Sequence, residues 1–117
     1  MNDFIIYHHP RCSKSRETLA LLEQSGVTPR VVEYLTTPPT AAELKAIVTK
    51  LGIAPAQLVR KSEEIYKSDY AGKTLTDAQW IDAMVKHPIL IERPIVIHGE
   101  HAVLGRPPES VKKLLPG

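Results

Sequence analysis

The hydrophobic and polar positions change their period along the chain, and these changes outline the expected elements. Short apolar runs typical of buried strands occur at residues 3–7 and again in RVVEYL, residues 30–35. Between them, Leu19 and Leu22 fall on one face of a helical pattern, which predicts a helix over residues 13–25. A strand, a helix and a strand joined by short links predict a right-handed parallel β-α-β unit.

Capping signals mark the middle of the chain. Thr40 and Glu43 have capping-box spacing ahead of an apolar helical pattern, and Thr76 and Gln79 repeat this arrangement. Each pair predicts the start of a helix, because the two residues can satisfy first-turn N–H groups reciprocally.

A further helix is predicted between these two. Pro55 suits the first turn of a helix, and the pattern continues through Leu58 to about Tyr66. Residues 40–86 are therefore expected to form a helical insert of three segments.

Strand signals return after the insert. Two apolar runs, residues 95–97 and 102–104, are joined through Gly99 and Glu100, which predicts a hairpin with a two-residue loop. A last helix is expected to open at the prolines at 107 and 108 and to carry three apolar residues: Val111, Leu114 and Leu115. The order is that of a thioredoxin-like α/β fold, β-α-β and then β-β-α, with a helical insertion between the two halves. We expect one domain over residues 1–117.

Composition limits the classes of protein that need consideration. A chain of 117 residues with 43% hydrophobic residues can bury a core without metals or disulfides. The net charge of +2 and the 5% aromatic content do not favour nucleic-acid binding. The N-terminal apolar run is too short for a signal peptide or a membrane span. A single cysteine fits a reducing compartment, so we expect a cytoplasmic protein.

That cysteine lies where a nucleophile is more plausible than a core residue. Cys12 stands in YHHPRCSKSRETL, at the junction of the first strand and the first helix, among basic and hydroxyl residues. First-turn N–H groups, the helix dipole, neighbouring basic side chains and a protonated His8 would all lower the thiol pKa. Ser15 lies three residues after Cys12, where a C-x-x-C motif has its second cysteine, and its hydroxyl could donate a hydrogen bond to the thiolate. A cysteine phosphatase is excluded, because its C-x5-R loop needs arginine where this chain has threonine.

Three arginines that are far apart in the sequence could meet the cysteine in this topology. Arg93 precedes Pro94 at a strand start, where thioredoxin-like folds place a cis-proline, so we predict a cis Arg93–Pro94 bond. Arg106 follows the hairpin, and Arg60 lies on the insert. Guanidinium groups bind oxyanions through charge-assisted and often bidentate hydrogen bonds. For Arg60 the alternative is an ion pair with Glu64, one helical turn on.

The five histidines do not make a convincing metal site. His98 and His101 flank the hairpin turn, and His8 precedes Cys12 by four residues. A closed zinc site needs four ligands, usually including paired cysteines, so we expect no metal. His8 is close enough to Cys12 to act as its electrostatic partner or base.

With these residues assembled, the chain resembles the glutaredoxin-coupled arsenate reductase family nearly end to end. The resemblance is carried by YHHPRCSKSRETL and by ERPIVIHGEHAVLGRPPESVKKLL. It implies that Cys12 is the catalytic cysteine and that His8 and Ser15 favour its thiolate. It also implies three oxyanion-binding arginines: Arg60, Arg93 and Arg106. One departure is His9, where the family's H-N-P loop has asparagine.

The resemblance also implies a reaction. The Cys12 thiolate would attack arsenate, glutathione as a co-substrate would reduce the adduct, and glutaredoxin would resolve the mixed disulfide as arsenite is released. External thiols are needed because the chain has no second cysteine. We expect a monomer with no bound cofactor, no nucleic-acid partner and no membrane association.

Two other functions remain open at this stage. A glutathione-dependent thiol-disulfide oxidoreductase is compatible with Ser15 at the C-x-x-S spacing, although three arginines exceed what a disulfide substrate needs. A regulator that binds RNA polymerase, like the Spx relatives of this fold, would commonly carry a C-x-x-C switch that this chain lacks.

Overall fold

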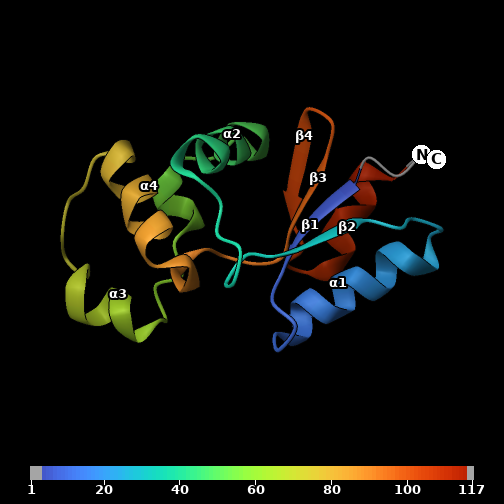
Figure 1. Ribbon diagram of the computed structural model, residues 1–117, viewed down its shortest axis with the longest axis horizontal. Helices are drawn as coiled ribbons and strands as arrows, with labels where there is room; N and C mark the ends of the chain where they lie inside the picture. Colours follow the sequence, from blue (N-terminus) through green and yellow to red (C-terminus); the bar gives the residue numbers. More distant parts are fainter. Residues whose placement is uncertain (1–3, 116–117) are drawn as a thin grey trace. The chain divides into compact units, whose positions relative to one another are not determined.

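The computed structural model describes residues 4–115 (Figure 1). They divide into two compact units, which we call the sheet unit and the helical unit. The sheet unit combines the chain up to Thr37 with the chain from Arg93 onward, and the helical unit is Pro38–Glu92. The helical segments expected for residues 40–86 lie inside the helical unit. None of the helices in the described range has the length and apolarity of a membrane span.

The sheet unit contains four strands in the order β2-β1-β3-β4 (Figure 1). Its elements are β1 (Phe4–His8), α1 (Ser13–Gln24), β2 (Arg30–Glu33), β3 (Ile95–His98), β4 (His101–Leu104) and the 3₁₀ helix η3 (Pro108–Leu114). β1 is parallel to β2 and antiparallel to β3, and β3 is antiparallel to β4. The predicted β-α-β unit and the thioredoxin-like strand arrangement are confirmed, and residue 3 of the first predicted strand lies outside the described residues.

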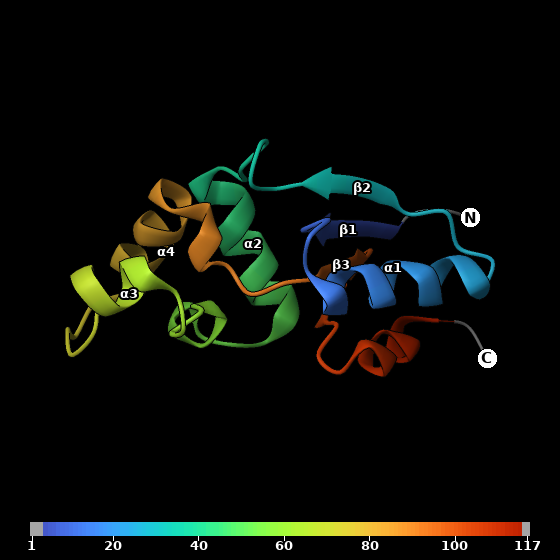
Figure 2. The same cartoon turned by 90° about the horizontal axis from the view of Figure 1, so that it is seen from below.

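Alternation along β1 builds the core of the sheet unit. Phe4, Ile6 and His8 are buried, while the residues between them are half-buried. Phe4 and Ile6 pack with Leu22 of α1 and Val111 of η3, so both helices cover the same face of the sheet (Figure 2). β1 ends at His8, and a short loop, residues 9–12, leads from it to the N-terminus of α1.

The β3–β4 hairpin has the predicted two-residue loop. His98 pairs with His101, which leaves Gly99 and Glu100 as the loop. Gly99 has a φ of +62°, a conformation that glycine adopts without the steric cost that other residues incur.

The helical unit contains three α-helices and two 3₁₀ helices. They are α2 (Ala41–Leu51), η1 (Pro55–Leu58), α3 (Glu64–Asp69), α4 (Asp77–Lys86) and η2 (Pro88–Leu90). Both predicted capping boxes are present, at Thr40 with Glu43 and at Thr76 with Gln79. α2 and α4 begin at the predicted residues because a capping box is formed by residues that are close together in the sequence.

The prediction of one helix from Pro55 to about Tyr66 is wrong. A 3₁₀ turn ends at Leu58, and α3 does not begin until Glu64. Val59 is extended and forms an isolated antiparallel bridge with Ile91, which interrupts the helix. The predicted last helix is present as a 3₁₀ helix that ends at Leu114, so Leu115 follows it.

Candidate functional site

The single cysteine caps the N-terminus of α1. Cys12 is extended, its N–H donates to the carbonyl of His9 at 3.0 Å, and its own carbonyl accepts from the N–H of Arg16 at 3.0 Å. The chain therefore leaves β1, turns once and enters α1 with the thiol at the junction. First-turn N–H groups that have no partner within the helix face this position, as the sequence analysis expected.

The local hydrogen bonds activate the thiol. Partial burial raises the pKa of Cys12, but this is more than offset by the backbone N–H of Ser15, the Arg93 guanidinium and the backbone N–H of Lys14. The net result is a pKa below the ordinary thiol value. The expectation that nearby basic side chains cause the shift needs correction. Lys14 lowers the thiol pKa through its backbone N–H, while its ammonium group pairs with Glu17 at 3.9 Å. The cationic side chain that lowers the pKa is that of Arg93, which lies two residues before β3.

Two of the three predicted arginines are at the thiol. Arg106 donates from Nη2 to the Cys12 Sγ at 3.5 Å and from Nε to the carbonyl of Arg93 at 2.7 Å. Arg93 is only 7% exposed, and its side chain also hydrogen-bonds to the thiol. The Arg93–Pro94 bond is cis, as predicted, and so is Arg106–Pro107. Two guanidinium groups and a helix N-terminus thus converge on one sulfur atom.

His8 and Ser15 are joined to each other. The Nδ1 atom of His8 lies 2.6 Å from the Ser15 hydroxyl oxygen, and the same oxygen accepts the N–H of His9 at 3.0 Å. Ser15 is fully buried and His8 is 6% exposed. The Ser15 hydroxyl therefore orders the loop before Cys12, whereas its contribution to the thiolate comes from its backbone N–H.

The expectation of a protonated His8 also needs correction. Burial lowers the pKa of His8, Glu33 partly opposes this shift, and Arg16 adds to it. A neutral imidazole is therefore favoured at neutral pH. Its acceptor nitrogen can accept a hydrogen bond from the Ser15 hydroxyl, which would fix the ring beside the cysteine loop.

Arg60 belongs to the helical unit and has carboxylate partners there. Its Nε lies 3.2 Å from Glu63 and its Nη1 lies 2.9 Å from Glu92. Its pKa is raised, because the two carboxylates outweigh the opposing effect of burial. The alternative considered for Arg60, an ion pair with Glu64, is wrong in its partner, because the guanidinium pairs with Glu63 and Glu92. The N–H of Arg60 donates to the carbonyl of Leu90, and this places the guanidinium beside Glu92 instead.

Two residues that the sequence analysis did not assign lie behind the arginines. Thr18 is fully buried on α1, and its hydroxyl is 2.8 Å from the carbonyl of Lys14 and 3.4 Å from that of Gly105. Gly105 immediately precedes Arg106 and donates its N–H to Pro94 at 2.9 Å. A buried hydroxyl on an otherwise apolar helix face is the signal that could have drawn attention to Thr18.

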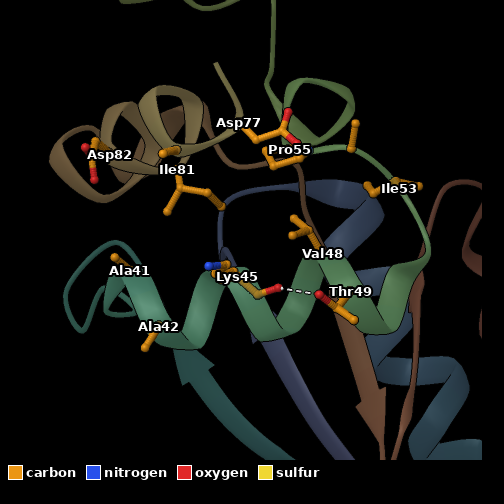
Figure 3. A pocket seen from close by; sticks show the side chains of 12 residues that line it. Ala41, Ala42, Lys45, Val48, Thr49, Ile53, Pro55, Asp77, Ile81 and Asp82 are labelled. Atoms are coloured by element: carbon orange, nitrogen blue, oxygen red, sulfur yellow. Dashed lines mark hydrogen bonds between the residues drawn. The ribbon is translucent and has the colours of Figure 1, made fainter. Parts of the chain in front are cut away.

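Other features of the molecule offer less chemistry. A cavity of about 680 Å³ in the helical unit is lined by α2, α4 and the η1 region, and Figure 3 shows its mainly apolar wall around Val48, Pro55 and Ile81. Its charged lining residues are Lys45, Asp77 and Asp82, all exposed. Between residues 4 and 115, no group of three or more His, Cys, Asp or Glu side chains is arranged to hold a metal ion.

Comparisons with known proteins show which family and which structures the chain resembles. The model of the ArsC family matches residues 7–114. The chain is 49% identical over 113 residues to an arsenate reductase of Haemophilus influenzae, which covers 95% of this chain and 97% of that protein. It is also 49% identical over 112 residues to the Escherichia coli K12 protein named "Uncharacterized protein YfgD", with 94% of each chain covered. A solved arsenate reductase from Vibrio cholerae superposes with a TM-score of 0.93 at 48% identity, covering 96% of this chain and 97% of that one.

Proposed function

The chain belongs to the ArsC family, and on that premise we propose that it is an oxidoreductase that reduces arsenate to arsenite. The observation that carries the proposal is the donation from Arg106 Nη2 to the Cys12 Sγ at 3.5 Å, at the N-terminus of a helix. A tetrahedral oxyanion that approached this sulfur would meet guanidinium and backbone N–H donors together, which is the environment that an anion requires.

The first step is nucleophilic attack. The Cys12 thiolate attacks the arsenic(V) atom of arsenate, a sulfur–arsenic bond forms, and one arsenate oxygen leaves as water after protonation. The lowered pKa of Cys12 supports this step because the thiolate is the nucleophilic form. Arg93 and Arg106 would hold the remaining oxygens and would stabilise the negative charge that develops on them.

The second step transfers electrons. A glutathione thiolate attacks the Cys12 sulfur, the sulfur–arsenic bond breaks, and its electron pair stays on arsenic, which leaves as arsenite. The two thiols are oxidised to a mixed disulfide while arsenic(V) is reduced to arsenic(III). Glutaredoxin then attacks the mixed disulfide by thiol exchange and regenerates the Cys12 thiolate. External thiols are required because the chain has one cysteine.

The other predicted site residues have supporting roles in this proposal. The His8–Ser15 contact at 2.6 Å orders the loop that presents Cys12, and a neutral His8 acts as an orienting group. Arg60 remains a proposed oxyanion ligand. To bind arsenate it would have to exchange at least part of its contact with Glu63 or Glu92, so we assign it the smallest contribution of the three arginines.

A coupled assay tests the proposal. Purified protein is mixed with arsenate, glutathione, glutaredoxin, glutathione reductase and NADPH, and NADPH consumption is followed at 340 nm. We expect consumption that depends on arsenate and on each thiol component, with arsenite as the product. Consumption that is independent of arsenate would contradict the proposed reaction. Omitting glutaredoxin alone distinguishes the adduct chemistry from the disulfide exchange that follows it.

A thiol-disulfide oxidoreductase is the second candidate. The groups that lower the Cys12 pKa are two backbone N–H groups and Arg93, and these would activate the thiol toward a glutathione mixed disulfide as well. The contact from Arg106 favours the oxyanion reaction, because the two sulfur atoms of a disulfide bond carry no negative oxygens for a second guanidinium to bind at the reacting centre. Exchange with a small glutathione mixed disulfide, measured on the same variants, separates the two candidates.

A further inference from the structure

Thr18 is a polar residue at a position where a helix facing a core usually carries an aliphatic one. It is fully buried on α1, one helical turn before the core residue Leu22. Its hydroxyl donates to the carbonyl of Lys14 at 2.8 Å. That carbonyl is also the regular acceptor for the backbone N–H four residues on, so the hydroxyl is not needed to complete the helix. The buried hydroxyl therefore calls for another explanation.

The explanation lies across the helix, at Gly105. The Thr18 hydroxyl is 3.4 Å from the Gly105 carbonyl, so one proton is shared between two acceptors. A Cβ added to Gly105 would lie 2.5 Å from the Thr18 Oγ1, 3.0 Å from its methyl group and 2.8 Å from Pro94. The φ of Gly105 is outside the left-handed region, so glycine is required here for space. Thr18, Pro94 and Gly105 form a close-packed junction.

This junction lies directly behind an arginine of the site. Gly105 donates its N–H to the carbonyl of Pro94 at 2.9 Å, which ties the end of β4 to the start of β3. Arg106 follows, and its guanidinium spans from the carbonyl of Arg93 to the sulfur of Cys12. Because Cys12 is fixed at the start of α1 and Gly105 rests on the middle of α1, the separation between Gly105 and this helix determines where Arg106 points.

We propose that Thr18 is a positioning residue: its buried hydroxyl and methyl group set the separation between α1 and Gly105 and thereby hold the Arg106 guanidinium beside Cys12 for an oxyanion. The proposal rests on the proposed function in one respect, that Arg106 binds the oxyanion. The hydrogen bonds of Thr18 go to the carbonyls of Lys14 and Gly105, whereas the groups that lower the Cys12 pKa are the N–H groups of Ser15 and Lys14 and the Arg93 side chain. Loss of Thr18 should therefore affect oxyanion binding more than thiol activation.

The main test replaces Thr18 by valine, which has a similar shape but no hydroxyl. Arsenate affinity is measured as protection of Cys12 from iodoacetamide, and KM and kcat are measured in the coupled assay. We expect affinity to weaken and KM to rise by roughly three- to tenfold, the effect of losing a neutral hydrogen bond, with kcat changed less. The pH midpoint of Cys12 alkylation should stay close to the wild-type value, because Arg93 and the N–H groups of Lys14 and Ser15 remain in place.

The helical unit supplies a matched control. Thr49 on α2 donates its hydroxyl to the carbonyl of Lys45 at 3.0 Å, the same bond to the residue four positions back, but it is exposed and lines the cavity shown in Figure 3. Thr49→Val should leave arsenate affinity and KM at wild-type values. An equal effect of Thr18→Val and Thr49→Val would overturn the proposal, because it would trace the loss to a generic change in a helix.

A double-mutant cycle tests the route of the effect. If Thr18 acts through Arg106, then Thr18→Val should weaken binding little further in an Arg106→Ala background, because the group that it positions is gone. Fully additive losses would overturn the proposal. Thr18→Ser keeps the hydroxyl and should retain most of the affinity, whereas Thr18→Ala should not. Should Thr18→Val fail to fold, this serine–alanine comparison decides the question, and equal affinities of the two variants would refute it.

The protection assay keeps this proposal separate from the proposed reaction. Protection of wild-type Cys12 by arsenate or inorganic phosphate requires only binding at the site. Protection without arsenate-dependent NADPH consumption would overturn the proposed reaction and leave the positioning role testable by affinity. Absence of protection by either oxyanion would overturn the positioning role, because Arg106 would then have no oxyanion to bind.

Discussion

Of the three arginines assigned to oxyanion binding, the sheet unit holds Arg93 and Arg106 and the helical unit holds Arg60, and the surroundings in the two units differ. In the sheet unit, Arg106 contacts the sulfur of Cys12 at 3.5 Å and a backbone carbonyl at 2.7 Å. In the helical unit, Arg60 lies 3.2 Å and 2.9 Å from the carboxylates of Glu63 and Glu92. Arg106 therefore contacts the proposed nucleophile, whereas Arg60 is paired with two carboxylates.

The difference in formal charge explains what each arginine can do. One guanidinium and two carboxylates give the Arg60 cluster a formal net charge of −1, which opposes the binding of an oxyanion as long as both carboxylate contacts are kept. At the thiol, Arg93 and Arg106 face a single thiolate, so the formal net charge is +1 and an oxyanion is attracted. An arginine at the expected position is therefore not enough to make an anion site, because the groups that contact the arginine determine whether it can bind an anion.

The largest expected effect concerns the thiol itself. Cys12→Ser should abolish arsenate-dependent NADPH consumption, because a serine hydroxyl remains protonated at neutral pH and its oxygen cannot give up electrons to form a mixed disulfide with glutathione. Circular dichroism should show unchanged secondary structure, since the side chain is only half-buried and its backbone hydrogen bonds are retained. Measurable turnover by the folded variant would remove the difference between the two units, because the sheet unit would no longer contain the nucleophile.

The next effect concerns the arginines of the sheet unit. Arg93→Ala and Arg106→Ala should each lower kcat/KM for arsenate by roughly ten- to a hundredfold, the loss expected for a charge-assisted hydrogen bond worth about 1.5–3 kcal/mol. Lysine at either position should restore part of the loss, because it keeps the charge without the planar fork. Exchange with a glutathione mixed disulfide should fall less, and equal losses in both assays would favour the thiol-disulfide oxidoreductase.

The same two variants should differ in thiol activation. Arg93 is among the groups that lower the Cys12 pKa, so Arg93→Ala should move the midpoint of iodoacetamide alkylation to higher pH. Below that midpoint the thiol is protonated and unreactive, so the variant should lose most reactivity near and below neutral pH. Arg106→Ala should move the midpoint less. Identical midpoints in the two variants would contradict separate roles for Arg93 and Arg106.

Much of the fold could be predicted because its signals are local. The capping boxes at Thr40 and Thr76 are each complete within four residues, and both helices begin there. The hairpin loop consists of two adjacent residues, Gly99 and Glu100, and the positive φ of Gly99 is one that glycine adopts readily. The break at Val59 could not be predicted, because it depends on pairing with Ile91, more than thirty residues further along the chain.

The candidate site divides in the same way. The position of Cys12 at a helix start follows from the adjacent sequence. Of the two carboxylate partners of Arg60, Glu92 is distant in sequence, and Glu63 takes the place of Glu64 because residues 59–63 lie outside the helices. His8 is uncharged because it is buried within the folded sheet unit, and a sequence pattern does not report this burial. The local environment of Cys12 could be predicted from its neighbours in the chain, whereas the approach of Arg93 and Arg106 to Cys12 could be predicted only through the topology and the family resemblance.

A third effect should appear in the pH dependence of stability. Burial lowers the pKa of His8 below its ordinary value of about 6.5, so the unfolded chain takes up a proton before the folded chain does. The free energy of unfolding should therefore decline as the pH falls below about 6.5, and His8→Gln should show a shallower decline. Urea unfolding between pH 7.5 and pH 5 measures both. Parallel profiles would show that His8 is not held neutral in the sheet unit.

A fourth and smaller effect concerns Arg60. Arg60→Ala should lower kcat/KM by less than about threefold, and it should reduce the free energy of unfolding by about 1 kcal/mol, because Glu63 and Glu92 lose their shared cation. The matched control is Lys61→Ala, which removes an exposed cation from the neighbouring position. A tenfold or larger loss in kcat/KM with Arg60→Ala alone would show that its carboxylate contacts exchange for the oxyanion, and the contrast between the two arginines would no longer hold.

The smallest effect on the site is expected from the cap of α4. The Thr76 hydroxyl accepts from the N–H of Gln79 at 3.2 Å, and the Gln79 side chain accepts from the N–H of Thr76 at 2.8 Å. Thr76→Ala removes the first of these bonds and should lower the free energy of unfolding by about 1 kcal/mol, whereas Thr76→Ser should retain most of it. The groups that activate Cys12 belong to α1 and to Arg93, and none of them belongs to the helical unit. The rate and the pH midpoint of Cys12 alkylation should therefore stay at wild-type values in Thr76→Ala at temperatures well below unfolding. A shifted midpoint in this folded variant would show that the helical unit tunes the thiol, and the chemistry could then no longer be assigned to the sheet unit alone.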